Sequence, residues 1–249
     1  MNCEAVVKHL VTWLQEKVHD AGALGVTLGV SGGIDSAVAA VLAKKAFPNN
    51  CIAIILPCES SVQDLIDSQL LLETFEIPYR VSEIDSAYQL IMTKNESFIK
   101  MDGDLQRLVR ANLKTRLRMI NLYYSAQARN YLVLGTTNKS EMTIGYTTKY
   151  GDSAVDIQIL GDLVKREIYE LARYLKIPEV IINKCPSAGL WLGQTDENEM
   201  GFSYNDLDDY IQYGKGDPEI VKRIEMLNKR SEHKRQMPPI ALIPEELRK

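Results

Sequence analysis

LGVSGGIDSAVAAVLAKK, residues 28–45, joins an apolar strand-like run to an Ala-rich helical run through two glycines, an aspartate and two serines. Gly32 and Gly33 let a ligand approach main-chain N–H groups closely. The helix expected from about Ile34 adds its unsatisfied N–H groups and the positive end of its dipole, so the turn favours an anion such as phosphate. Asp35 would repel that anion unless a divalent cation such as Mg²⁺ lay between them. A tight strand-to-helix turn capped by Ser and Asp is the alternative interpretation.

Strand and helix patterns alternate along the rest of the chain. Apolar or alternating runs predict strands at residues 25–31, 51–56, 79–84, 131–136 and 155–160. Helical spacing predicts helices at about residues 2–20, from 34 onward, and at 61–75, 104–130 and 162–175. This alternation is typical of the α/β class with a doubly wound parallel sheet flanked by helices, and we expect one domain over residues 1–249.

The predicted sheet also indicates where a ligand would bind. In doubly wound sheets, ligands bind beyond the carboxyl ends of the strands. Residues 31–33 follow one predicted strand and residues 136–138 follow another. We therefore expect both loops to share one crevice.

The composition excludes several classes of protein. A formal net charge of −4 argues against a general nucleic-acid binder, which would normally carry an overall basic surface. Charged residues interrupt the apolar residues of the first twenty positions, unlike a signal peptide, and no segment reaches membrane-spanning length. The four cysteines are scattered without a CxxC pair, which argues against a disulfide framework or a zinc site. We expect a cytoplasmic protein that binds neither nucleic acid nor a membrane.

The predicted helix at residues 104–130 has an unusually broad apolar arc. Such a width predicts packing against both its own sheet and a second subunit. The basic residues expected on the opposite, polar side are Arg107, Arg110, Lys114 and Arg118. Asn112 and Arg116 project from within the apolar arc instead. Because a buried guanidinium must be paired, Arg116 either bridges to an internal carboxylate or contacts a ligand.

Other polar residues have an ordinary structural interpretation as caps, turns or solvated charges. They are Thr136, Asn138, Lys149, Asp152, Asp156, Ser187, His233 and Lys234. Lys165 is expected on the surface of its helix. Glu141 fits a structural role less well, because with Asp35 it would supply a second carboxylate ligand for Mg²⁺.

SGGIDS resembles the pyrophosphate loop of the N-type ATP pyrophosphatases and matches neither the Walker A nor the GxGxxG pattern. Later motifs are similar to those of the ammonia-dependent NAD synthetases: NLKTRLRM, VLGTTNKSE, GYTTKYGD, CPSAGLWLGQTDE and EHKRQMPP. This resemblance covers nearly the whole chain. It implies an adenine nucleotide alpha hydrolase-like fold, a homodimer, and a Mg²⁺-dependent reaction in which ATP adenylates the nicotinate carboxylate of deamido-NAD and ammonia displaces AMP.

The resemblance also implies roles for individual residues. Those implied to contact ATP are Gly29, Val30, Ser31, Gly32, Gly33, Ile34, Asp35, Ser36, Thr136, Lys165 and Ser187. Those implied to contact deamido-NAD are Arg116, Lys149, Asp156, His233 and Lys234. Asp35 and Glu141 are implied to bind Mg²⁺, and Asp35 and Lys165 to be catalytic. Asp152 is our own addition, as the residue that orients or deprotonates ammonia.

Three rival functions differ from this one, two of them enzymes and one a protein without turnover. A glutamine-dependent enzyme would need an amidase domain with a reactive cysteine, and the synthetase pattern leaves no stretch for one. Another ATP pyrophosphatase could adenylate a different carboxylate or a tRNA base, but a tRNA enzyme is expected to carry a basic appendage or a CxxC pair. A nucleotide-binding regulatory protein would not need Asp35 and Glu141, and both are present.

Overall fold

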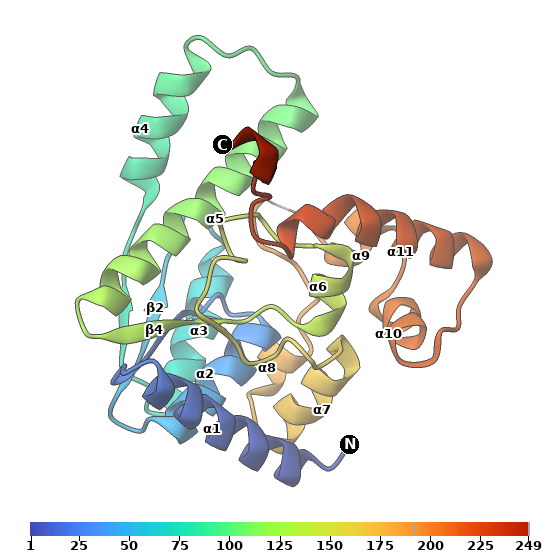
Figure 1. The fold of residues 1–249 in the computed structure, drawn as a ribbon. Helices are drawn as coiled ribbons and strands as arrows, with labels where there is room; N and C mark the ends of the chain where they lie inside the picture. The colour runs from blue at the N-terminus through green and yellow to red at the C-terminus, as the bar shows by residue number, and fades with distance from the viewer. Residues whose placement is uncertain (192, 249) are drawn as a thin grey trace.

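The computed structural model describes residues 1–191 and 193–248, and a parallel sheet lies at its centre (Figure 1). The strand order is β3-β2-β1-β4-β5, and each neighbouring pair runs parallel. The strands are β1 (Gly25–Gly29), β2 (Cys51–Ile55), β3 (Tyr79–Val81), β4 (Tyr131–Gly135) and β5 (Ile157–Gln158). This arrangement confirms the predicted doubly wound class, with a shorter edge strand at each side than the sequence predicted.

The helices agree with the predicted ranges where the apolar spacing is strong. They are α1 (Cys3–Asp20), α2 (Ile34–Ala46), α3 (Val62–Thr74), α4 (Asp85–Glu96), α5 (Gly103–Gln127), α6 (Lys139–Ile144), α7 (Lys165–Tyr174), α8 (Glu179–Ile182), α9 (Asp196–Met200), α10 (Tyr204–Tyr213) and α11 (Pro218–Ser231), with short 3-10 turns at Glu232–Lys234 and Glu245–Leu247. The sequence did not predict α4, because among its residues only Tyr88 is buried and the helix has no clear apolar face.

Alternating residues of β2 point to two separate hydrophobic clusters. Ala53 and Ile55 belong to the larger cluster with α1, α2 and α7, whereas Ile54 packs with residues of α4 and α5. Figure 1 shows α5 running along one side of the sheet, while α1, α2 and α7 gather at the other. The sheet is therefore covered on both faces, which is why β2 reads as an unbroken apolar run.

A smaller lobe lies beside the carboxyl ends of the strands and contains α6, α9, α10 and α11 (Figure 1). Its own cluster consists of Ile144, Met200, Phe202, Tyr204, Leu207 and Ile224. The lobe packs on the sheet domain through contacts of α10 with α7. It thereby brings residues from the last quarter of the chain to the ends of β1 and β4.

In helix α5, some residues predicted to be exposed are buried, and some predicted to be buried are exposed. Lys114 was predicted on the polar side, yet it is buried, forms an ion pair with Glu59 at 2.8 Å and donates to the Leu190 carbonyl at 3.0 Å. Arg116, predicted within the buried arc, is exposed. The apolar arc is wider than the surface that the sheet covers, and Leu108 remains 54% exposed and Tyr124 80% exposed. The predicted position of Lys114 was wrong because its partners, Glu59 and the Leu190 carbonyl, come from distant parts of the chain. The exposed apolar residues leave the contact with a second subunit as a prediction.

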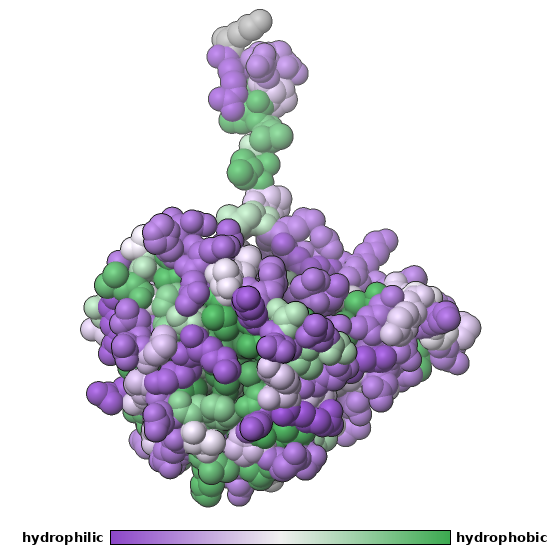
Figure 2. Space-filling model, turned by 90° about the horizontal axis from the view of Figure 1, so that it is seen from below, coloured by the Kyte–Doolittle hydropathy of each residue, from purple (hydrophilic) through white to green (hydrophobic). Residues whose placement is uncertain are grey.

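The C-terminal segment after residue 236 stands out from the body of the molecule (Figure 2). Its apolar side chains are exposed, including Met237 at 87% and Leu242 at 86%. Apolar side chains in water are unfavourable, so this segment is a candidate for contact with another surface. Among the described residues, no helix has the length and apolar character needed to span a bilayer.

Candidate active site

A cavity of about 580 Å³ opens at the carboxyl ends of the central strands. Residues directly after three strands line it, among them Ser31 after β1, Leu56 after β2 and Thr136 after β4. The predicted sharing of one crevice by residues 31–33 and 136–138 is confirmed. The sides of this cavity come from α5, from residues 184–191 and from the small lobe.

The loop before α2 is built closely against α3. Gly32 has a φ of +76°, and a Cβ there would lie 2.7 Å from the Asp64 carbonyl oxygen. The Ser36 hydroxyl accepts from the Ser31 amide at 3.2 Å and donates to the Gly33 carbonyl at 2.9 Å, which fixes the turn. Gly33 is the N-cap of α2 and provides no side-chain cap. The helix N-terminus is thus left open toward the cavity, in the arrangement that binds phosphate in other proteins.

Lys184 connects this loop to α3, and no sequence pattern predicted this contact. Its ammonium lies 2.5 Å from Asp64 Oδ1 and 2.7 Å from the buried Asp67 Oδ2, and it donates to the Gly32 carbonyl at 3.4 Å. Lys184 also lines the cavity. One side chain therefore holds Gly32 in place and balances part of the negative charge of Asp64 and Asp67.

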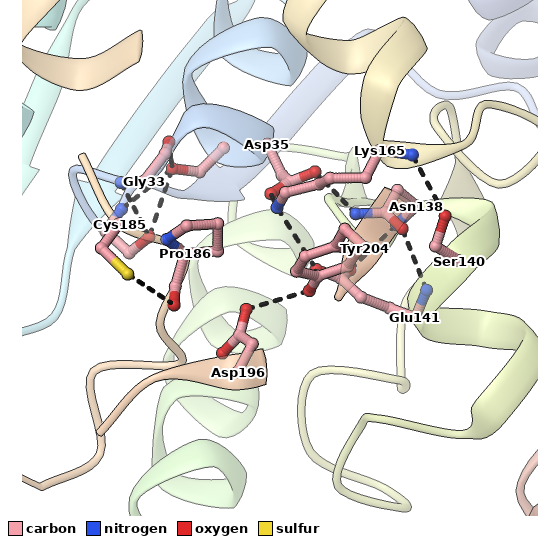
Figure 3. A network of polar contacts seen from close by, with 12 residues as sticks. Gly33, Asp35, Asn138, Ser140, Glu141, Lys165, Cys185, Pro186, Asp196 and Tyr204 are labelled. Carbon is pink, nitrogen blue, oxygen red and sulfur yellow. Dashed lines mark hydrogen bonds and ion pairs between the residues drawn. The ribbon is translucent and has the colours of Figure 1, made fainter. Parts of the chain in front are cut away.

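Asp35, Glu141 and Lys165 meet beside the N-terminus of α2 (Figure 3). Lys165 Nζ lies 2.5 Å from Asp35 Oδ2 and 3.8 Å from Glu141 Oε1. Asn138 donates to Asp35 Oδ1 at 2.8 Å. Lys165 is only 2% exposed, so its predicted surface position is wrong. The amphipathic pattern of α7 could not reveal this, because the carboxylates that pair with Lys165 come from α2 and α6.

Burial and neighbouring charge shift the pKa values of this cluster. Burial raises the pKa of the Glu141 carboxyl, and the nearby Asp35 raises it further, while Lys165 acts in the opposite direction. Burial alone would lower the pKa of the Lys165 ammonium, but Asp35 and Glu141 more than offset that effect and raise it. Lys165 therefore stays charged, and it holds a position between Asp35 and Glu141.

The donor set fits Mg²⁺. The Lys165 ammonium already lies between the two carboxylates, which marks that space as a cation position. Among the described residues, no group of three or more His, Cys, Asp and Glu side chains is placed to hold a metal. Two carboxylates completed by phosphate oxygens and water are nevertheless a usual ligand set for Mg²⁺. Glu141 also has a structural role, because its Oε2 accepts from the Asn138 amide at 3.1 Å and caps α6.

The small lobe adds a third carboxylate that the sequence did not reveal. The Tyr204 hydroxyl donates to Asp196 Oδ2 at 2.9 Å and lies 3.4 Å from Glu141 Oε1. Lys165 Nζ lies 4.8 Å from the centre of the Tyr204 ring. Asp196 belongs to the motif CPSAGLWLGQTDE, in which Leu192 lies outside the described residues. The motif was the only available signal, since no spacing rule joins Asp196 to Asp35.

A half-buried cation lines the cavity on the α5 side. Arg118 donates to the Leu56 carbonyl at 3.1 Å and to the Ser60 hydroxyl at 3.4 Å. Burial lowers the pKa of its guanidinium. The sequence had placed Arg118 on the polar side of the helix, and that prediction was wrong because the cavity and the β2–α3 loop lie there.

The residues predicted for deamido-NAD fall into two places. Arg116 donates to the Lys149 carbonyl at 3.3 Å, and Lys149 Nζ lies 3.4 Å from His233 Nδ1. Lys234 lines the cavity next to this cluster and donates to the Gly145 and Thr147 carbonyls. Asp156 lies apart, at the edge between β4 and β5, where it accepts from the Val133 amide at 2.8 Å and from the Tyr123 hydroxyl at 3.1 Å.

The remaining predicted residues line the cavity. Asp152 accepts from the Thr148 amide at 2.7 Å, and partial desolvation by the surrounding protein raises the pKa of its carboxyl. Thr136 and Ser187 also line it, and the Ser187 hydroxyl accepts from the Gly189 amide at 3.1 Å. The cavity therefore combines an anion-binding end at α2 with acidic groups from α6 and α9.

Known proteins share this sequence and fold. A family model described as NAD synthase matches residues 6–238. An NH3-dependent NAD+ synthetase from Syntrophomonas wolfei is 61% identical over 248 residues and covers 100% of both chains, and one from Carboxydothermus hydrogenoformans is 44% identical over 243 residues, covering 98% of this chain and 99% of its own. The solved structure of an NMN synthetase from Francisella tularensis is 39% identical, has a TM-score of 0.90, and covers 98% of this chain and 99% of its own.

Proposed function

The chain belongs to the NAD synthase family, and on that premise we propose that it is an ammonia-dependent NAD synthetase. It uses ATP to adenylate the nicotinate carboxylate of deamido-NAD and then replaces AMP with ammonia, forming NAD. The observation that carries this proposal is the meeting of Asp35, Glu141 and Lys165 beside the open N-terminus of α2. Residues 1–249 would act as one catalytic unit.

In the first step, an oxygen of the nicotinate carboxylate attacks the α-phosphorus of ATP. The bond from that phosphorus to the bridging oxygen of the β-phosphate breaks, and pyrophosphate leaves. The loop Gly29, Val30, Ser31, Gly32, Gly33, Ile34, Asp35 and Ser36 would hold the phosphates, with Thr136 and Ser187 as further ATP contacts. Lys165 and the N–H groups of α2 would stabilise the negative charge on the leaving pyrophosphate, which is the main contribution a protein makes to such a transfer.

Mg²⁺ would be held by Asp35 and Glu141, and when bound it would neutralise phosphate charge near these carboxylates. Lys165 would hold Asp35 and Glu141 close together beside the phosphates. Lys184 would hold Gly32 and so preserve the shape of the loop.

In the second step, the ammonia nitrogen attacks the carbonyl carbon of the acyl-adenylate, and the carbon–oxygen bond to AMP breaks. The nitrogen loses a proton on forming the amide. Asp152 is our candidate to accept it, because it lines the cavity and burial raises the pKa of its carboxyl, which makes it a stronger base.

Deamido-NAD would be bound by the basic cluster of Arg116, Lys149, His233 and Lys234, with Asp156 as a separate contact. The phosphates and carboxylate of this substrate suit such a cluster. The Francisella relative supports a second candidate substrate, nicotinate mononucleotide, which carries the same reacting carboxylate on a smaller nucleotide.

We also propose a homodimer, in which a second copy covers the exposed apolar residues of α5. These are Leu105, Leu108, Val109, Ile120 and Tyr124, each more than 40% exposed. Sedimentation velocity tests the oligomeric state, and a monomer at micromolar concentration would contradict the dimer.

We further propose a cytoplasmic location, because the reaction uses cellular ATP.

One incubation tests the proposed reaction. The purified chain is mixed with ATP, Mg²⁺, ammonium and either deamido-NAD or nicotinate mononucleotide. Formation of NAD, AMP and pyrophosphate from deamido-NAD is expected. ADP and orthophosphate as products would contradict the proposal, and faster amidation of nicotinate mononucleotide would favour the second substrate.

A further inference from the structure

Asp196 has one carboxylate oxygen that the described residues leave without a partner. The residue is 4% exposed, and its Oδ1 is buried with no hydrogen bond. The other oxygen, Oδ2, accepts from Tyr204 (Figure 3). A buried acceptor without a donor costs free energy, and one on a cavity wall often marks the position of a ligand. Asp196 is part of the wall of the cavity described above.

The surroundings of this oxygen are acidic and aromatic. Glu199 and Tyr146 also line the cavity. The Tyr146 hydroxyl lies near Asp196 as well, but its single proton is donated to Glu199 Oε2 at 2.6 Å, which leaves Asp196 Oδ1 without a hydrogen bond. Glu141 and Asp35 lie on the other side of Tyr204, where one ammonium, that of Lys165, is shared between them. Negative charge thus exceeds positive charge here, so a cation is favoured and a phosphate is disfavoured.

Groups that attract anions line other parts of the cavity. Arg118 lies on the α5 side, and the open N-terminus of α2 faces the glycine loop, whereas Lys184 is paired with Asp64 and Asp67. Anionic nucleotides are attracted to the glycine loop and to Arg118, and the space at Asp196 remains for a small cation. Because Asp196 is only 4% exposed, a large ligand cannot contact Oδ1, and a small one would do so after a rotation of the soft carboxylate torsion.

We propose that Asp196 binds the ammonium ion from which the nitrogen of the product is taken. Ammonium offers N–H donors to the unpartnered Oδ1, carries the charge that these acidic surroundings favour, and has the size of a water molecule. The inference rests on the proposed function and adds to it the binding site of the nitrogen donor. It concerns binding of the cation and is separate from the role proposed for Asp152.

The test separates adenylation from amidation. Deamido-NAD-dependent exchange of labelled pyrophosphate into ATP is measured with Mg²⁺ and without ammonium, and NAD formation is then measured against ammonium concentration. For Asp196→Asn, we expect exchange close to that of the unmodified chain and a KM for ammonium raised by about ten-fold or more, as for the loss of a charge-assisted hydrogen bond. Asp196→Ser, which keeps an acceptor for Tyr204, should give the same pattern.

The matched control is Glu197→Gln. It removes the same charge one residue away, from an exposed side chain that accepts from the Tyr204 amide at 2.9 Å, and Gln retains that acceptor. Its KM for ammonium should stay unchanged. Hydroxylamine, which is largely uncharged near neutral pH, should react equally well with the unmodified chain and Asp196→Asn.

Three results would overturn the ammonium site. One is an unchanged KM for ammonium in Asp196→Asn. Another is an equal loss of exchange and NAD formation, which would assign Asp196 to ATP binding or to the fold. The third is that the unmodified chain requires potassium for exchange and that Asp196→Asn no longer does. This result would assign Asp196 Oδ1 to a monovalent metal ion. Absence of exchange in the unmodified chain would instead contradict the proposed function itself.

Discussion

Substitution of Asp35 by Asn tests the cluster of Asp35, Glu141 and Lys165 at its central residue. Two donors face the Asp35 carboxylate, namely Lys165 Nζ on Oδ2 at 2.5 Å and Asn138 Nδ2 on Oδ1 at 2.8 Å. An Asn side chain has one acceptor oxygen, so its amide nitrogen must face one of these donors. Lys165, which is 2% exposed, then keeps only Glu141 at 3.8 Å as a charged partner.

The magnitude follows from the contacts that are lost. Loss of a charge-assisted hydrogen bond in a largely buried site costs about 1.5 to 3 kcal/mol of folding stability. The catalytic effect should be larger, because the variant also loses a proposed Mg²⁺ ligand. A loss of roughly 3 kcal/mol of transition-state stabilisation corresponds to more than 100-fold in rate. We therefore expect a folded protein with pyrophosphate exchange reduced by at least that factor.

The assay is pyrophosphate exchange across a series of Mg²⁺ concentrations, with urea unfolding measured in parallel. Asp162→Asn is the control, because Asp162 forms an exposed ion pair with Lys139 at 2.8 Å and is 96% exposed itself. It should leave exchange and its Mg²⁺ dependence unchanged. Near-normal exchange by Asp35→Asn at limiting Mg²⁺ would refute the assignment of Asp35 as a metal ligand.

Three further predictions concern the loop, the nucleotide substrate and the pH dependence. Gly32→Ala should lower the free energy of unfolding by about 1 to 2 kcal/mol and raise the KM for ATP, because the φ of Gly32 is +76° and a Cβ would meet the Asp64 carbonyl. An unchanged urea unfolding curve would contradict this prediction. Arg116→Ala should weaken deamido-NAD binding by about ten-fold with little effect on ATP binding, because Arg116 is exposed and, among the described residues, its guanidinium donates to the Lys149 carbonyl. Equal weakening of both ligands in calorimetry would indicate a structural arginine. At a fixed concentration of free ammonia, the amidation rate should rise as the pH passes upward through the raised pKa of Asp152, because a general base acts in its deprotonated form. Asp152→Asn should remove that rise, and a rise that persists in this variant would exclude Asp152 as the base.

The sequence predicts those parts of the structure that depend on local pattern. The strands at Cys51–Ile55 and Tyr131–Gly135 and the helix at Ile34–Ala46 lie within the predicted ranges, because apolar periodicity and turn residues determine them. The loop SGGIDS was identified for the same reason, since its glycines and the following helix are neighbours in the chain. Ligands bind beyond the carboxyl ends of parallel strands, and this rule predicted that residues 136–138 lie at the same crevice.

Long-range contacts account for what the sequence did not reveal. Lys165 was expected at the surface because its carboxylate partners lie 130 and 24 positions away in the chain, on α2 and α6. Lys184 is recognised only when residues 64 and 67 of α3 are placed beside it. Asp196 and Tyr204 reach Glu141 through the packing of the small lobe, which no periodicity predicts. Arg118 was assigned to the wrong face because a helical wheel does not show where a cavity lies, and Lys114 because the wheel does not show Glu59 and Leu190, which pair with it from elsewhere in the chain.

The fate of the carboxylate oxygen tests the central claim most directly. Deamido-NAD is labelled with ¹⁸O in its nicotinate carboxylate and incubated with the chain, ATP, Mg²⁺ and ammonium, and the products are analysed by mass spectrometry. Attack of that carboxylate on the α-phosphorus transfers one labelled oxygen to AMP, and we expect AMP with one ¹⁸O alongside unlabelled pyrophosphate. Unlabelled AMP, or label in orthophosphate, would contradict adenylation of the substrate carboxylate.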